Sequence, residues 1–170
     1  MSLYAGIDLH ANNSYLAILD ETDKLVEAKR QPNDLESVRR ILEPYRTGLA
    51  GIAVESTFNW YWLVDGLEES GYPVHLVNTL AAQQYQGLKY TDDKTDARWL
   101  AHMLRLGILP TGWIYPKAKR AVRDLLRRRS QLVRQKTANR LGLRNVLERS
   151  GASGAPDLRR TCLPAETASA

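Results

Sequence analysis

The sequence is poor in cysteine and in long apolar runs, and both shortages narrow what the protein can be. Cys162 is the single cysteine among 170 residues, so it has no partner for an intramolecular disulfide and argues against a thiolate zinc site. No apolar stretch approaches the roughly 20 residues that a membrane-spanning helix needs. Residues 1–8 have neither the basic segment nor the apolar run of a signal peptide. We therefore expect a cytoplasmic protein without a membrane partner.

Acidic side chains are scarce in one part of the chain only. Residues 1–116 carry 10 basic and 15 acidic side chains, whereas residues 117–149 carry 12 basic and 2 acidic ones. The net charge of +5 for the whole chain hides this division. Such an asymmetry is typical of a globular body joined to an element that binds a polyanion, and a solvated basic helix face is the alternative.

The length and the local patterns predict one α/β domain with an appendage. Alternating or apolar runs predict strands over residues 3–9, 14–19, 24–29, 51–56 and 73–78. Periodic apolar positions predict helices over residues 35–42, 60–70, 79–88 and 95–106, the first capped by Asn33 or Asp34. This order matches the RNase H-like arrangement, a mixed sheet with flanking helices in which a three-strand meander is extended by parallel strands, although the pattern alone leaves several α/β folds possible.

A basic helical region is expected to follow this domain. From residue 117 to about 148 the sequence has no proline and has apolar residues near a seven-residue repeat, which predicts one long helix or a helical pair. We predict a catalytic domain over residues 1–112, a basic helical segment over 113–150 and a disordered tail over 151–170, because the tail lacks an amphipathic period.

Four carboxylates stand at positions where they can meet. Asp8 lies at the end of the first predicted strand, Glu55 ends the fourth, and Asp93 and Asp96 are three residues apart where a loop joins a helix. If both of the last two are helical, their spacing of three puts them on one helix face. Clustered carboxylate oxygens suit Mg²⁺ and Mn²⁺ alike. The set predicts a catalytic site in which all four hold divalent ions for cleavage or transfer of phosphodiester bonds.

Three sequence blocks carry a resemblance to a known family. They read Gly6-Ile7-Asp8-Leu9-His10, Ala53-Val54-Glu55-Ser56-Thr57 and Thr91-Asp92-Asp93-Lys94-Thr95-Asp96-Ala97. Over residues 3–150 the chain resembles the DEDD-type insertion-sequence transposases, a family that includes bridge-RNA-guided recombinases and a pilin-gene invertase. The last block is similar to the family's Lys-Thr-Asp-x-x-Asp-Ala.

The resemblance has implications for fold, chemistry and partners. It implies a RuvC-like domain that works on DNA strands with Mg²⁺, with Asp8, Glu55, Asp93 and Asp96 as the four acids and a structured guide RNA as a further partner. It also implies a C-terminal domain with a catalytic serine, so we expect a chain truncated before that domain. The family's Lys-Thr reads Thr91-Asp92 here, which leaves Asp92 as an alternative third ligand, although the spacing of three favours Asp93.

The basic segment supplies the candidate nucleic-acid contacts. Its charged side chains occupy more than one helix face, so they can meet phosphates of different strands or a structured RNA. The candidates are Lys117, Lys119, Arg120, Arg123, Arg127, Arg128, Arg134, Lys136, Arg140 and Arg144. The apolar repeat predicts a homo-oligomer formed through this segment, although residues 134–140 are too polar for a strong coiled coil.

One histidine and three aromatic residues near the predicted acids are interpreted as structural rather than functional. His10 follows Asp8 by two and is interpreted as structural, since a lone histidine is more often so. Trp60, Tyr61 and Trp62 are expected to pack in the core rather than to line a substrate groove.

Two other functions compete with a transposase. The block at residues 6–8, followed by residues 12–14, is similar to the first phosphate loop of actin-like ATPases and sugar kinases, but their second glycine is His10 here. A non-catalytic module that binds DNA or RNA, or that regulates a longer transposase, is the other alternative. Metal-dependent strand cleavage separates it from an enzyme.

Overall fold

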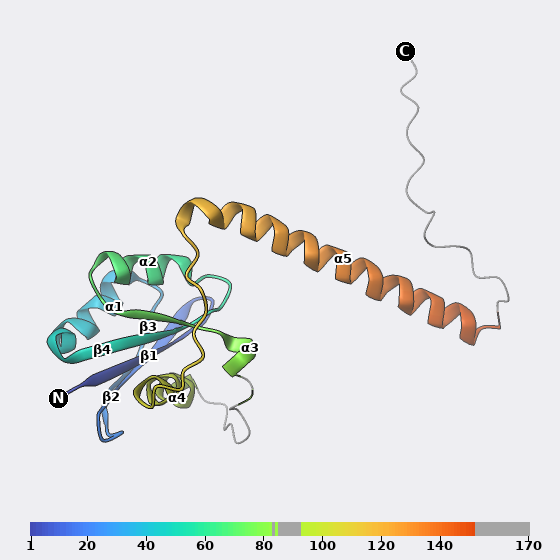
Figure 1. The fold of residues 1–170 in the computed structure, drawn as a ribbon. Coiled ribbons are helices and arrows are strands. Elements are labelled where there is room, and N and C mark those ends of the chain that lie inside the picture. Colours follow the sequence, from blue (N-terminus) through green and yellow to red (C-terminus); the bar gives the residue numbers. More distant parts are fainter. Residues whose placement is uncertain (83, 85–92, 152–170) are drawn as a thin grey trace, which may run out of the picture. The chain divides into compact units, whose positions relative to one another are not determined.

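The fold consists of two units, which Figure 1 shows in the computed structural model. The structure describes residues 1–82, 84 and 93–151. The first unit runs from Met1 to Ile114, and the second begins at Tyr115.

A five-stranded mixed sheet forms the centre of the first unit. Its strands are β1 (Leu3–Leu9), β2 (Asn13–Asp20), β3 (Leu25–Pro32), β4 (Leu49–Glu55) and β5 (Val74–Val77), in the order β3-β2-β1-β4-β5. The first three strands pair antiparallel, whereas β1–β4 and β4–β5 pair parallel. A meander extended by parallel strands is the predicted RNase H-like arrangement, so the fold prediction is confirmed.

Helices cover both faces of this sheet (Figure 1). One face carries α1 (Leu35–Leu42), the 3-10 turn η1 (Glu43–Gly48) and α2 (Tyr61–Glu69), and the other carries α4 (Asp93–Arg105). Side chains alternate along each strand, so Ile7 of β1 points into the core under α1 and α2, whereas Ala53 of β4 packs with Leu100 and Met103 of α4. This alternation decides which strand residues face α4.

The starts of α1 and α2 agree with the local sequence signals. The Asp34 carboxylate caps α1 by accepting a hydrogen bond from the Ser37 amide at 2.8 Å. Trp60 is buried in the core under α2, with Tyr61 and Trp62 packed against it, which confirms the predicted core role of the three aromatic residues.

The start of α4 differs from the prediction. The helix begins at Asp93 rather than at Thr95, so the prediction of a loop over residues 93 and 94 is wrong. The polar composition of this stretch suggested a loop. Acidic side chains in the first turn interact favourably with the helix dipole, so Asp93 is a suitable residue to begin the helix. Of the helix predicted over residues 79–88, α3 (Thr79–Ala82) is described and most of the rest lies outside the described residues.

The segment after α4 returns to the sheet beside β5. The Asn78 amide donates to the Pro110 carbonyl at 2.8 Å, and the Gly112 amide donates to the Leu76 carbonyl at 2.7 Å. These bonds cover the outer edge of β5 and leave β3 as the other edge strand.

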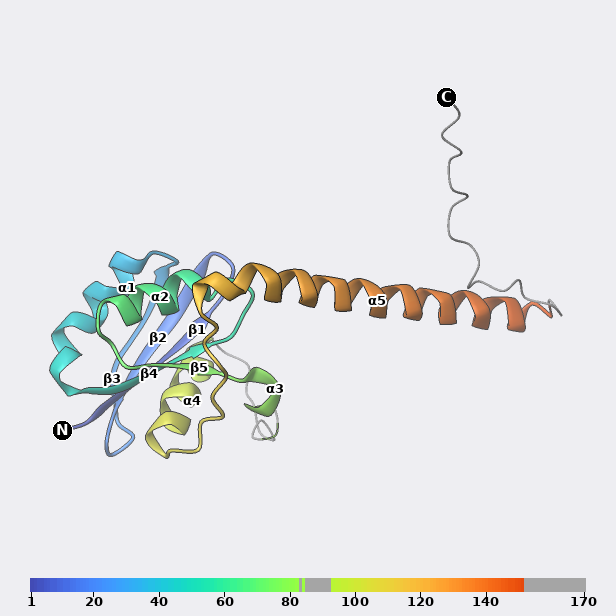
Figure 2. The same ribbon diagram turned by 45° about the horizontal axis from the view of Figure 1, so that its top comes forward.

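The second unit is one continuous helix of 33 residues, α5 (Lys117–Arg149), which Figure 2 shows most clearly. The choice between one long helix and a helical pair is thereby settled. Among the described residues, no helix combines the length and the apolar character that crossing a bilayer requires. The predicted disorder of the tail falls on residues 152–170, which lie outside the described residues.

Candidate functional site

The sheet register brings Asp8 and Glu55 side by side on the face that α4 covers. Ile7 pairs with Val54 in the parallel β1–β4 ladder, and the next residue on each strand is Asp8 and Glu55. Because Ile7 and Val54 point under α1 and α2, their neighbours point toward α4. Asp8 is only 3% exposed, whereas Glu55 is half-buried.

Gly6 allows α4 to approach this pair closely. A Cβ atom at Gly6 would overlap the Ala97 carbonyl oxygen and would lie 2.7 Å from the Ala101 amide nitrogen, so the helix backbone lies directly on β1. This contact lies one turn from the start of α4, where Asp93 and Asp96 stand in the first turn. A glycine before the strand-end aspartate therefore positions the helix that carries the other two acids.

Asp8, His10 and Asp93 form a tight cluster. The Nε2 atom of His10 lies 3.2 Å from Oδ2 of Asp8 and 3.1 Å from Oδ1 of Asp93. One donor atom from each residue lies within 4.8 Å of the other two, which is a spacing that can hold a metal ion. Asp93 is thus placed beside Asp8, and the alternative third ligand, Asp92, lies outside the described residues.

Sequence reasoning missed His10 and Arg30 as members of this cluster. The Arg30 Nη2 atom donates to Oδ2 of Asp93 at 2.5 Å. The register explains the contact, since Asp8 pairs with Tyr15 and Tyr15 pairs with Arg30, which forms one row across three strands on the α4 face. The spacing of two between Asp8 and His10 was the available signal for the histidine, but nothing local marks Arg30.

Opposing influences act on the Asp93 carboxylate. Burial acts to raise the pKa of Asp93, but the nearby His10 imidazole and the hydrogen bond from Arg30 outweigh it and hold that pKa below its ordinary value. Asp93 is therefore ionised at neutral pH, as a carboxylate ligand must be.

Glu55 and Asp96 meet at a second, small hollow. They line one pocket of about 40 Å³, together with apolar side chains of α4 and β5 that include Trp99 and Met103. The structure thus brings the four predicted acids to one sheet face in two neighbouring pairs, Asp8 with Asp93 and Glu55 with Asp96.

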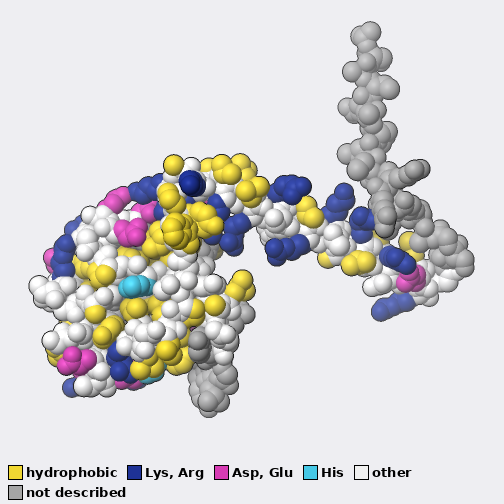
Figure 3. Space-filling view, viewed as in Figure 1, with side chains coloured by type: hydrophobic (Ala, Val, Ile, Leu, Met, Phe, Trp, Pro, Cys, Tyr) yellow, Lys and Arg dark blue, Asp and Glu magenta, His cyan; other side chains and the backbone are white. Residues whose placement is uncertain are grey.

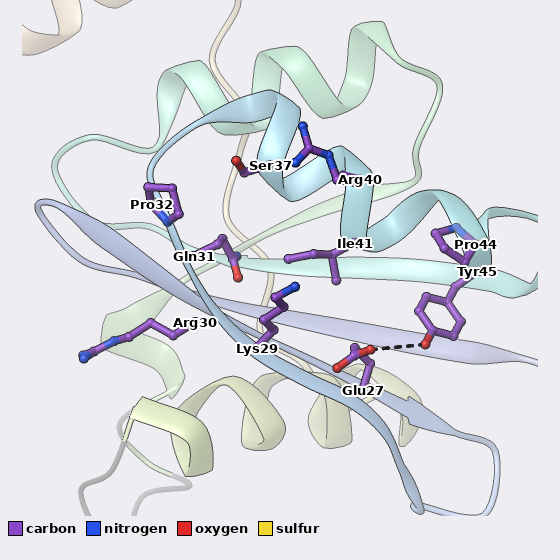
Figure 4. A pocket seen from close by; sticks show the side chains of 10 residues that line it. All are labelled: Glu27, Lys29, Arg30, Gln31, Pro32, Ser37, Arg40, Ile41, Pro44 and Tyr45. Carbon is purple, nitrogen blue, oxygen red and sulfur yellow. Dashed lines mark hydrogen bonds between the residues drawn. The ribbon is translucent and has the colours of Figure 1, made fainter.

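A larger pocket of about 300 Å³ lies between β3, α1 and η1 (Figure 4). Lys29 and Gln31 of β3 and Ile41 of α1 line it, and Tyr45 reaches Glu27 across it with a hydroxyl contact of 3.5 Å. Its mixture of charged and apolar groups contains none of the four predicted acids.

The predicted nucleic-acid contacts lie along α5, where most basic side chains are exposed (Figure 3). Arg120 differs, because it is only 8% exposed and its Nε atom donates to the Tyr115 carbonyl at 2.8 Å, which holds the start of the helix. Arg123 stacks over the Tyr115 ring at 4.8 Å, and Arg144 pairs with Glu148 at 2.7 Å. The remaining exposed candidates are Lys117, Lys119, Arg127, Arg128, Arg134 and Lys136.

Comparison with known proteins identifies the family. A family model described as a transposase, DEDD_Tnp_IS110, matches residues 5–151. The chain therefore belongs to this transposase family, as the sequence resemblance indicated, and this decides against the actin-like ATPase alternative. No curated protein matches the sequence.

Among solved structures, the chain is similar to T. thermophilus RuvC in complex with Holliday junction substrate. The two share 16% sequence identity with a TM-score of 0.47, over 66% of this chain and 100% of that one.

Proposed function

We propose that the first unit is the catalytic core of a transposase, which cleaves or transfers DNA strands with divalent ions held by Asp8, Glu55, Asp93 and Asp96. The observation that carries this proposal is the convergence of carboxylates from β1, β4 and α4 on one face of an RNase H-like sheet. Mg²⁺ accepts such hard oxygen ligands, and Mn²⁺ does so too.

The residues present fit a divalent ion. Oδ2 of Asp8 is buried and makes no hydrogen bond, although a buried carboxylate oxygen normally has a donor. Like charges on neighbouring carboxylates also repel, and a bound cation relieves that repulsion. Bound ions would supply activation of a water or 3′-hydroxyl and stabilisation of the leaving oxygen.

The chain's own residues have separate tasks in this proposal. Asp8, buried in β1, and Asp93, oriented by Arg30, would hold the ion at the sheet. Glu55 and Asp96 complete the ligand set from the adjoining pocket.

Metal-dependent cleavage tests the catalytic proposal. We expect the chain to nick DNA in Mg²⁺ or Mn²⁺, and we expect Asp8→Ala plus Glu55→Ala to abolish both nicking and metal binding measured by calorimetry. Glu36→Ala plus Glu68→Ala is the matched control, because it removes two exposed carboxylates from α1 and α2 and should leave both readouts unchanged. Binding of DNA without cleavage in either metal would instead favour the non-catalytic module.

We further propose that α5 binds the phosphate backbone of DNA or of a structured RNA. Its exposed basic side chains point in several directions, so they can reach more than one strand (Figure 3). Replacing Arg127, Arg128, Arg134 and Lys136 with glutamine should lower affinity and reduce the log–log salt slope by about 0.9 for each duplex phosphate that the variant no longer neutralises. The pair Arg39→Gln and Arg46→Gln, in the first unit, is the control.

The same helix is proposed to pair with a second copy. Its apolar side chains remain between 49% and 71% exposed, which is costly for so many large residues on one helix. They are Val122, Leu125, Leu126, Leu132, Val133, Leu141, Leu143 and Val146. Light scattering tests this: a dimer that Leu125→Ser plus Leu143→Ser converts to monomer is expected, and a monomeric wild type contradicts it.

A further inference from the structure

We propose that His10 is a nitrogen ligand of the divalent ion that Asp8 and Asp93 bind, and that this ligand makes the site prefer Mn²⁺ to Mg²⁺. This inference rests on the proposed metal-dependent function and adds a residue and a metal preference to it. It differs from the sequence interpretation of His10, which took the residue as structural.

The distances around Nε2 of His10 are those of ligand atoms that share one ion. Neighbouring ligands in an octahedral site with bonds of about 2.1 Å are about 3.0 Å apart. Nε2 lies 3.2 Å from Oδ2 of Asp8 and 3.1 Å from Oδ1 of Asp93, and all three atoms lie within 4.8 Å of one another. An ion can therefore bind all three without moving the elements that carry them.

The backbone holds His10 in this position. Its amide donates to the Asn13 carbonyl at 2.9 Å, which closes the turn between β1 and β2. Its carbonyl accepts from the side-chain amides of Asn33 at 2.8 Å and Asn59 at 3.1 Å. Three contacts from three different parts of the chain fix the residue, so the imidazole is presented to the carboxylates at a low cost in entropy.

Two buried polar atoms in the cluster make no hydrogen bond. Nε2 of His10 and Oδ2 of Asp8 lie close enough for an ion pair, but neither has a hydrogen-bond partner. Asp8 is only 3% exposed, so water does not solvate its carboxylate well. Buried polar atoms without partners are costly, and an ion between these two atoms would satisfy both.

The chemistry of the donor set determines the preferred ion. Mg²⁺ favours oxygen ligands, whereas imidazole nitrogen binds divalent transition metals well. Two carboxylates with one imidazole therefore suit Mn²⁺, which accepts both kinds of donor. Glu55 and Asp96, with oxygen donors only, do not contribute to this preference.

Pulsed electron paramagnetic resonance of the Mn²⁺-loaded full chain tests the ligand directly. We expect nitrogen coupling from a bound imidazole in the wild type. We expect it to persist in His75→Gln, which removes a histidine of β5 outside the cluster, and to disappear in His10→Ala. Calorimetry should show Mn²⁺ affinity falling tenfold or more in His10→Ala, since even outer-shell partners of a metal cost roughly 10- to 100-fold. Mg²⁺ affinity should change less, so the Mn²⁺/Mg²⁺ affinity ratio falls.

The outcomes separate this inference from the proposed function. If Mn²⁺ binds and Asp8→Asn abolishes binding, but the wild type shows no nitrogen coupling or His10→Ala keeps the affinity ratio, the role of His10 is overturned and the carboxylate site stands. If the folded wild type binds neither ion, both proposals fail. The wild-type spectrum needs no variant to fold, and His10→Gln provides a second variant of similar size.

Discussion

Gly6 offers a sharp test of how the site is assembled, because only a glycine lets α4 lie on β1. In Gly6→Ala the new methyl group would overlap the Ala97 carbonyl oxygen and would lie 2.7 Å from the Ala101 amide nitrogen. Both are backbone atoms, so no side-chain rotation relieves the clash and the whole helix must move away. Asp93 and Asp96 stand in the first turn of that helix, and they would move with it.

The expected cost follows from overpacking. Inserting a methyl group into a well-packed core typically costs 1–3 kcal/mol, and we expect about 2–3 kcal/mol here because the obstruction is backbone. For a unit of this size that corresponds to a fall in Tm of roughly 8–15 °C. Thermal unfolding followed by circular dichroism measures the loss, and calorimetry on the folded variant at low temperature should show weaker Mn²⁺ binding.

Gly112→Ala is the matched control in the same unit. Its added methyl group would come no closer than 3.6 Å to another atom, which is ordinary contact, and Gly112 does not have a positive φ. The control should unfold within about 2 °C of the wild type, because it creates no clash. Equal Tm values for Gly6→Ala and Gly112→Ala would refute the idea that close approach at Gly6 positions the acids.

Three further substitutions test the supports of the site by denaturant unfolding and melting curves. Asp23→Asn should cost about 0.5–1 kcal/mol at pH 7, because Asp23 contacts three basic side chains of α4 while 31% exposed. Burial acts to raise the pKa of Asp23, but the three basic partners outweigh it and hold that pKa below its ordinary value. The stabilisation is therefore present above the unfolded pKa of about 3.9 and is lost as the pH falls through the folded value. An equal difference in stability between variant and wild type at pH 7 and at pH 2 would contradict this. Asp34→Ala should cost about 1 kcal/mol by removing the α1 cap, whereas Asp34→Asn should not. Asp8→Asn should stabilise the metal-free protein by about 1 kcal/mol and abolish any rise in Tm caused by Mn²⁺, and a metal-dependent rise that survives the substitution would argue against Asp8 as a ligand.

Much of the fold was predictable from the sequence, because its signals are local. Alternation and apolar runs located all five strands, and Asp34 and the apolar spacing after it located α1. Asp8 and Glu55 could be placed together in advance, since both end apolar strands, and the ends of neighbouring parallel strands meet at one edge.

The rest of the cluster depends on register and on loop geometry, which local patterns do not reveal. Arg30 faces Asp93 because β3 pairs with β2 in one particular register, and a slip of one residue would turn Arg30 to the other face. His10 lies just beyond β1, where its orientation is set by Asn33 and Asn59, residues 23 and 49 positions away. Contacts at such separations are tertiary, so the folded structure was needed to identify Arg30 and to show that the imidazole of His10 faces the carboxylates.

The position of α4 is controlled from both ends, and this links the stability of the fold to the chemistry of the site. Near its start the helix rests on Gly6, and near its end His102 and Arg105 bind Asp23 in the β2–β3 turn at 2.6 and 3.2 Å. A rigid helix held at two points has little freedom to slide, so repulsion between Asp8 and the acids of its first turn cannot be relieved by moving apart. That repulsion is retained in the folded protein, where a divalent cation can relieve it. The same packing that fixes the helix therefore favours ion binding, and a substitution at Asp23 should weaken Mn²⁺ affinity although Asp23 is not one of the proposed ligands.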